Sequence, residues 1–79
     1  MGKGFICRID KKGNYIGNSL DVYSQIMTSS IIFTGDKNAF KTFNTGDVFH
    51  YSDDDLEDWS GNFEVIFCHD NKITGKRIR

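Results

Sequence analysis

Apolar and polar residues alternate in short runs, and this period of two predicts a chain built mainly of strands. Residues 4–10 (GFICRID) alternate around Phe5, Cys7 and Ile9, and a turn-forming stretch leads into a second strand that begins at Tyr15. Further strands are predicted where β-branched and aromatic residues gather, at residues 31–33, 48–51, 63–68 and 73–78.

Three other stretches show helical spacing. Apolar residues at positions 20, 23, 26 and 27 predict a short helix over residues 20–28, and two phenylalanines three apart predict one helical turn at residues 40–43. The sequence SDDD at residues 52–55 resembles a capping box with Asp in its fourth position, so a helical turn is predicted from there to Trp59.

Strands outnumber helices and short turns connect them, which favours an α+β fold. We expect a small antiparallel sheet of about five or six short strands with one to three short helices. The alternative is a small OB- or SH3-like β-barrel, since short strands with one helical turn describe those folds too. With 79 residues, the chain is expected to form a single domain over residues 1–79.

Strand phase gives a finer expectation. Phe63, Val65 and Phe67 are predicted to face the core from a central strand that is covered on both faces. Cys68 would then point to the opposite side of the sheet from Cys7. We therefore expect no disulfide between them.

The cysteine count also indicates a compartment. Two cysteines without Cys-x-x-Cys spacing are typical of a protein from a reducing environment. No apolar stretch approaches the roughly 18 residues of a membrane span, and residues 1–10 are too short and too mixed for a signal peptide. We expect a soluble, cytoplasmic protein. The lack of Pro beside many Ile, Phe, Asn and Lys residues resembles coding from an AT-rich bacterial or phage genome.

The sequence motifs of enzymatic chemistry are absent. The chain has no nucleophile elbow, P-loop or dinucleotide-binding pattern. Cys68 and His69 are adjacent and would point to opposite faces of a strand, which disfavours a zinc site with Cys7 and His50. The acidic run at residues 53–58 lacks the glycine that an EF-hand needs at its sixth position. The expectation is a non-enzymatic protein without catalytic residues, metal or cofactor.

The formal net charge is only -1, but the charge is unevenly placed along the chain. Five of the eleven acidic residues fall within residues 53–58. Our interpretation is that this turn docks on a basic surface of a partner protein, as a phage-type inhibitor would. The partner-binding residues are then Asp53, Asp54, Asp55, Glu57, Asp58, Trp59 and Tyr51. An acidic helix start that only keeps the protein soluble explains the same run.

Basic residues concentrate near the two ends of the chain. If the first and last strands are neighbours, these residues form one basic area, and the alternative function is a small nucleic-acid-binding module. The residues concerned are Lys3, Arg8, Lys76, Arg77 and Arg79. Self-assembly, with the acidic turn of one copy on the basic end of the next, is a third hypothesis. All three hypotheses predict a molecule with opposite electrical poles.

Overall fold

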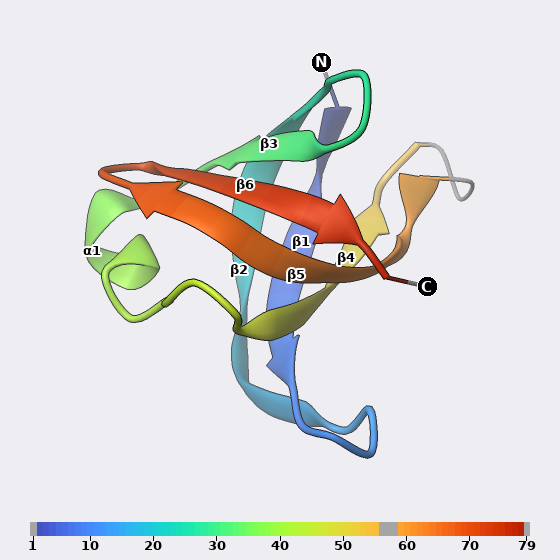
Figure 1. Cartoon of the computed structure of the whole chain (residues 1–79), viewed down its shortest axis with the longest axis vertical. Helices are drawn as coiled ribbons and strands as arrows, with labels where there is room; N and C mark the ends of the chain where they lie inside the picture. The colour runs from blue at the N-terminus through green and yellow to red at the C-terminus, as the bar shows by residue number, and fades with distance from the viewer. Residues whose placement is uncertain (1, 56–58, 79) are drawn as a thin grey trace.

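Six antiparallel strands form a closed barrel in the computed structural model, which describes residues 2–55 and 59–78 (Figure 1). Around the barrel the strand order is β1-β2-β3-β6-β5-β4. The strands are β1 (Gly2–Ile9), β2 (Tyr15–Ile26), β3 (Ile31–Thr34), β4 (Val48–Asp53), β5 (Gly61–His69) and β6 (Lys72–Arg77). One short helix, α1 (Lys37–Phe40), lies between β3 and β4.

The barrel consists of two three-stranded meanders, β1–β2–β3 and β4–β5–β6. The segment that contains α1 joins them, and the barrel closes where β1 pairs with β4 and β3 pairs with β6. Almost no helix is present in the described residues, so the alternative of a small β-barrel fits better than the α+β fold that we favoured. Its six strands exceed the five of an OB-fold.

Aromatic rings fill the barrel. Phe33 on β3 contacts the rings of Phe49, Tyr51 and Phe63 edge-on, with centroid distances of 5.3, 4.8 and 5.5 Å. Gly75 on β6 makes room for them, because a Cβ there would lie 3.1 Å from Phe33 and from Phe49. Edge-to-face pairs of this kind add stability beyond the apolar area they bury, so a few rings give a small barrel a dense core.

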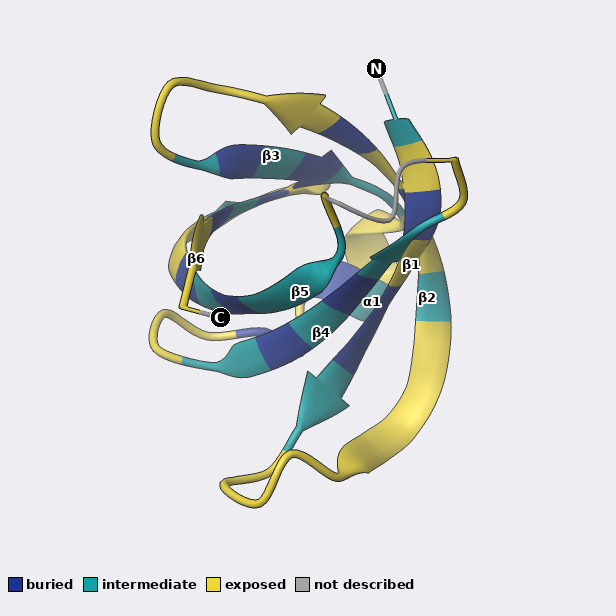
Figure 2. Ribbon diagram, turned by 90° about the vertical axis from the view of Figure 1, so that its right-hand side faces the viewer, coloured by how far each residue is buried: buried dark blue, intermediate teal, exposed yellow. Residues whose placement is uncertain are grey.

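The α1 segment covers one end of the barrel. Asp36 caps the helix by accepting a hydrogen bond from the Asn38 N–H at 2.9 Å. The helical turn predicted at residues 40–43 lies earlier, at Lys37–Phe40, and both Phe40 and Phe43 are buried in the core cluster. Figure 2 shows the ring of strands from the opposite end, with α1 behind it.

The helix predicted for residues 20–28 is wrong, because most of this stretch belongs to β2. Its buried residues are Val22 and Ser24, which alternate with exposed neighbours as a strand requires. Tyr23 and Ile26, which suggested the apolar side of a helix, are exposed.

The predicted phase of β5 is confirmed at Phe63 and Val65, which are buried, and is wrong at Phe67, because the strand is irregular. The β5 register shifts between Val65 and Phe67, so Phe67 is 59% exposed while Cys68 packs against the core. On β1 the register with β2 shifts between Ile6 and Arg8, and Ile6 is buried in place of Phe5. β5 is therefore covered on one face only, and both cysteines are free.

In the described part of the chain, no helix has the length and the hydropathy that a membrane crossing requires.

Candidate functional site

The end of the barrel that lies opposite α1 gathers segments from distant parts of the chain (Figure 1). They are the start of β1 at Gly2, the β2–β3 connection, the turn after β4, and the end of β6 at Arg77. Trp59 lines two hollows here, one shared with Gly2 and the other shared with Arg77. We call this region the Trp59 end.

A buried polar network around the Tyr51 hydroxyl lies beneath the surface of the Trp59 end. The Tyr51 hydroxyl lies 2.9 Å from Ser24 Oγ and 2.7 Å from Asp53 Oδ2. Because a carboxylate only accepts, Tyr51 donates its proton to Asp53 and Ser24 donates to Tyr51. Burial, followed by the nearby Asp53 carboxylate, raises the pKa of Tyr51 to about 12. Tyr51 is therefore neutral and fixed in place at physiological pH.

Asp53 connects this network to the acidic turn. Its other carboxylate oxygen accepts the Asp55 N–H at 2.9 Å, and its own N–H donates to Ser60 Oγ at 2.9 Å. The Asp54 N–H donates to the Lys3 carbonyl oxygen at 2.8 Å. The start of the turn is thus held on three sides. Ser52, the predicted cap, and Asp53 both belong to β4, and residues 56–58 of the predicted helical turn lie outside the described residues.

Apolar side chains border the acidic residues. Ile26, Met27 and Trp59 are 46%, 45% and 37% exposed. A small hollow of about 130 Å³ lies against them, and Arg77 lies at its edge with its guanidinium 5.2 Å from the Phe63 ring centre. Arg77 also donates to the Ser60 carbonyl oxygen at 3.1 Å. Exposed apolar residues beside carboxylates resemble the composition of a protein-binding surface.

The predicted partner-binding residues separate into three groups. Asp54, Asp55 and Trp59 lie together and exposed at the Trp59 end. Asp53 is half-buried and holds the turn, while Tyr51 is fully buried and so is not available as a surface anchor. The remaining two, Glu57 and Asp58, lie outside the described residues, as does Leu56 of the predicted helical turn.

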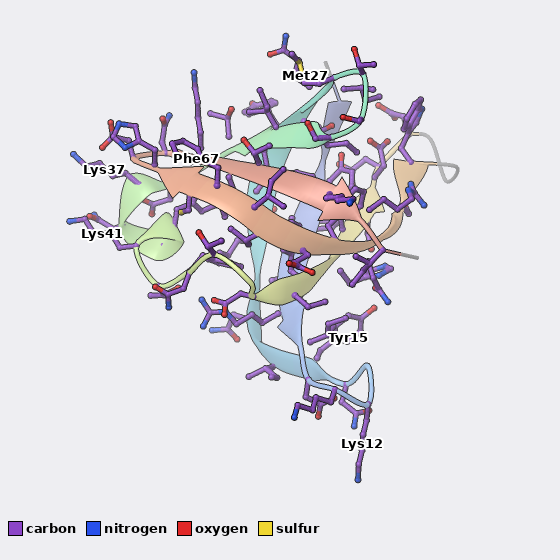
Figure 3. The ribbon with its side chains drawn as sticks, in the orientation of Figure 1. Lys12, Tyr15, Met27, Lys37, Lys41 and Phe67 are labelled. Carbon is purple, nitrogen blue, oxygen red and sulfur yellow. The ribbon has the colours of Figure 1, made fainter. Side chains whose placement is uncertain are left out.

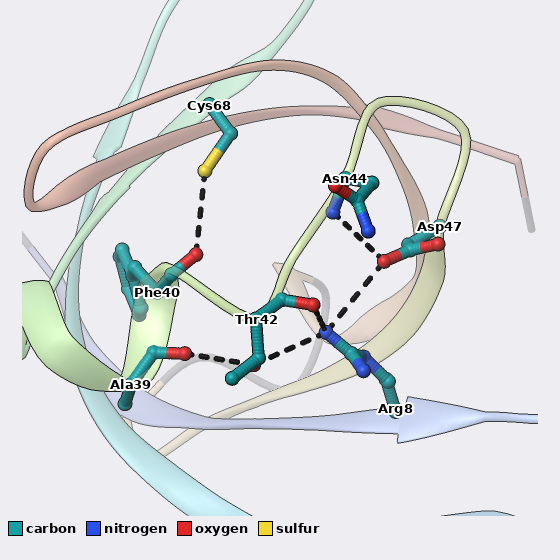
Figure 4. Close-up of polar contacts among 7 residues, drawn as sticks. All are labelled: Arg8, Ala39, Phe40, Thr42, Asn44, Asp47 and Cys68. Atoms are coloured by element: carbon teal, nitrogen blue, oxygen red, sulfur yellow. Dashed lines mark hydrogen bonds and ion pairs between the residues drawn. The ribbon is translucent and has the colours of Figure 1, made fainter.

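The predicted basic area does not form, because β1 and β6 lie on opposite sides of the barrel. Arg8 is engaged at the α1 segment, where it donates to the Thr42 carbonyl and hydroxyl and lies 3.6 Å from Asp47 (Figure 4). Its guanidinium also stacks 4.3 Å from the Phe43 ring centre. The other four basic residues are divided as well. On β6, Lys76 pairs in register with Glu64; Lys3 and Arg77 lie at the Trp59 end; Arg79 is outside the described residues.

The sequence predicted a basic pole opposite the acidic one. This basic pole does not form. Lys3 and Arg77 come from the two ends of the chain and lie beside the acidic turn, where the Lys3 carbonyl oxygen accepts from the Asp54 N–H and Arg77 donates to the Ser60 carbonyl oxygen. Five acidic residues lie in the sequence at 53–58. Among the described residues, three of these carboxylates, Asp53, Asp54 and Asp55, lie at this end together with Lys3 and Arg77.

Sequence reasoning missed the apolar part of this surface. Ile26 and Met27 were assigned to the apolar side of a short helix, although they are followed by Thr-Ser-Ser, a polar run typical of a turn. Reading that run as a hairpin connection would have left both residues at an exposed tip. Figure 3 shows Met27 at this tip, well away from Tyr15 and Lys12 on the projecting β1–β2 hairpin.

Among residues 2–55 and 59–78, no three His, Cys, Asp or Glu side chains lie close enough to hold a metal ion. No protein-family model matches the chain, and no curated protein and no solved structure matches it either.

Proposed function

We propose that this chain is a non-enzymatic binding protein that docks its Trp59 end on a basic surface of a partner protein. The observation that carries the proposal is the meeting of Trp59, Ile26 and Met27 with the exposed carboxylates of Asp54 and Asp55 at one end of the barrel. No other residue of the chain is a tryptophan. Trp is the residue type that most often anchors an interface.

The two kinds of residue have different roles in the proposed contact. The apolar side chains lose water on docking and supply affinity, while the carboxylates at the rim steer a basic surface into register. Asp53 accepts a hydrogen bond from the Asp55 N–H and donates one to Ser60 Oγ, and these bonds hold the arrangement before the partner arrives. This lowers the entropy cost of ordering the surface on binding.

The same arrangement does not favour the nucleic-acid alternative. Phosphate binding depends on several basic side chains that act together. Here Arg8 is paired with Asp47 on one side of the barrel, and Lys76 lies opposite Glu64 on the other.

The proposal is tested by measuring how tightly variants of this chain bind the purified partner. The partner is first captured from cells that naturally produce the chain, and its affinity for the purified chain is then measured by calorimetry. Trp59→Ala, and separately the pair Asp54→Ser with Asp55→Ser, are expected to weaken binding at least about tenfold.

Two matched substitutions serve as controls. Phe67→Ala removes an exposed aromatic ring away from the Trp59 end, and Asp21→Ser removes an exposed carboxylate from β2. Both are expected to leave the affinity within about twofold of the wild type. If the controls weaken binding and the Trp59-end variants do not, the proposed surface is wrong.

A further inference from the structure

The larger of the two hollows at the Trp59 end has a volume of about 340 Å³. It opens between the start of β1, the end of β2 and the turn after β4, and its lining includes Gly2, Gln25, Ile26, Asp55 and Trp59. It is large enough for one long side chain and too small for a folded segment.

The absence of a side chain at residue 2 keeps this hollow open. A Cβ on Gly2 would lie 2.5 Å from Ser24 Oγ and 2.8 Å from Asp53 Oδ2. The hollow thus ends on the polar network around Tyr51, not on an apolar floor. A group that enters it meets hydrogen-bond acceptors at its inner end.

The lining selects for a cation on an apolar stem. Ile26 and the Trp59 ring offer apolar surface, and the Asp55 carboxylate is exposed at the side. No basic residue lines this hollow among those that the structure describes. A guanidinium can stack on an indole ring while it donates two parallel hydrogen bonds to a carboxylate, which an ammonium cannot do.

The chain uses the same kind of contact next to Trp59. Arg77 lines the smaller hollow together with Trp59, stacks on Phe63 and donates to Ser60. The aromatic surface of this end therefore already accommodates one guanidinium, supplied by the chain itself.

We propose that the 340 Å³ hollow between Gly2, Asp55 and Trp59 receives an arginine side chain of the partner protein. This inference rests on the proposed function and adds the residue type that the partner must present. The guanidinium lies between the Trp59 ring and the Asp55 carboxylate, and its alkyl stem contacts Ile26.

The test is an NMR titration of the full chain with a capped Ala-Arg-Ala peptide. Its citrulline isostere, which keeps the shape and loses the charge, and a capped Ala-Lys-Ala peptide are titrated in parallel. The arginine peptide is expected to bind in the range of about 1–10 mM and to shift the signals of Gly2, Gln25, Ile26 and the Trp59 indole. The citrulline peptide is expected to bind at least tenfold more weakly, and the lysine peptide at least threefold more weakly.

Asp55→Asn is expected to weaken binding of the arginine peptide at least threefold, whereas Asp21→Asn is expected to leave its affinity unchanged. Equal binding of arginine and citrulline, equal binding of arginine and lysine, or shifts that map elsewhere would each overturn the inference. If the arginine peptide does not bind but binding of the partner still depends on Trp59, the inference fails and the proposed function stands. If the arginine peptide binds but the partner is insensitive to Trp59→Ala, the proposed function fails instead.

Discussion

Tyr51 shows how one side chain serves both the core and the surface. Its ring packs against Phe33 and Phe63, while its hydroxyl donates to Asp53, the residue that holds the acidic turn. In β4, the buried residues Phe49 and Tyr51 alternate with less buried residues, and the sequence predicted this strand correctly. The buried hydroxyl could not be predicted, because its partner Ser24 lies 27 residues away in the sequence.

The raised pKa of Tyr51 makes stability depend on alkaline pH. The folded pKa of about 12 exceeds the ordinary value of 10.0, so the neutral form is favoured by folding. This contribution is fully present below pH 10 and is lost as the pH rises from about 10 to 12. The loss corresponds to about 2–3 kcal/mol, and urea unfolding across this range measures it.

Tyr51→Phe isolates the effect, because this variant has no hydroxyl to ionise. We expect it to lose about 1–3 kcal/mol of stability at neutral pH, since it leaves buried partners unsatisfied, and to show a smaller decline above pH 10. Tyr15→Phe, at a position that is 65% exposed, should behave like the wild type. An unchanged alkaline decline in Tyr51→Phe would contradict this assignment.

At the scale of elements, the alternation of apolar and polar residues predicted the regular strands correctly and failed where a strand contains a bulge. β3, β4 and the β5–β6 hairpin agree with the predicted strands. β5 reverses its phase at a bulge, and no local pattern distinguished residues 63–68 from a strand covered on both faces. The start of β2 was predicted, but residues 20–26 were mistaken for a helix because the exposed Tyr23 and Ile26 are apolar while the buried Ser24 is polar.

The pairing of β1 with β4 depends on Gly4. Gly4 is buried opposite Asp53, and a Cβ there would overlap the Ser52 carbonyl oxygen on the β4 backbone. Gly4→Ala must therefore push the two strands apart, and we expect a loss of at least about 3 kcal/mol, measured by urea unfolding.

Gly13→Ala is the matched control for this substitution. Gly13 has a φ of 86°, but a Cβ there would meet nothing within 4 Å, so only the backbone conformation costs about 1–2 kcal/mol. If Gly4→Ala proves no worse than Gly13→Ala, the close approach of β1 and β4 is not a constraint on the fold.

At the scale of the whole molecule, closure of the barrel decides what the surface can do. Pairing of β1 with β4 and of β3 with β6 brings residue 2 beside residues 53–55, and residue 77 beside residue 59. Both pairings join strands that are far apart in the sequence, and no local pattern encodes them. The sequence therefore singled out the acidic turn and Trp59 but not Ile26, Met27 or Gly2, which the fold places beside them.

The two ends of the barrel differ as a result. Aromatic residues of the α1 segment fill one end, with Phe40 and Phe43 buried. At the other end, apolar and acidic residues are exposed together around Trp59. This difference agrees with the proposed function, in which one end of the barrel stabilises the fold and the other binds the partner.

Hydrogen exchange of backbone amides, compared between the free chain and its complex with the captured partner, tests this claim most directly. We predict slower exchange in the complex at Gly2 and at residues 25–30, 54–55 and 59–60, with residues 37–43 of the α1 segment and residues 10–19 of the β1–β2 hairpin unchanged. Slower exchange confined to the α1 segment or to the hairpin, with the Trp59 end unchanged, would contradict the account.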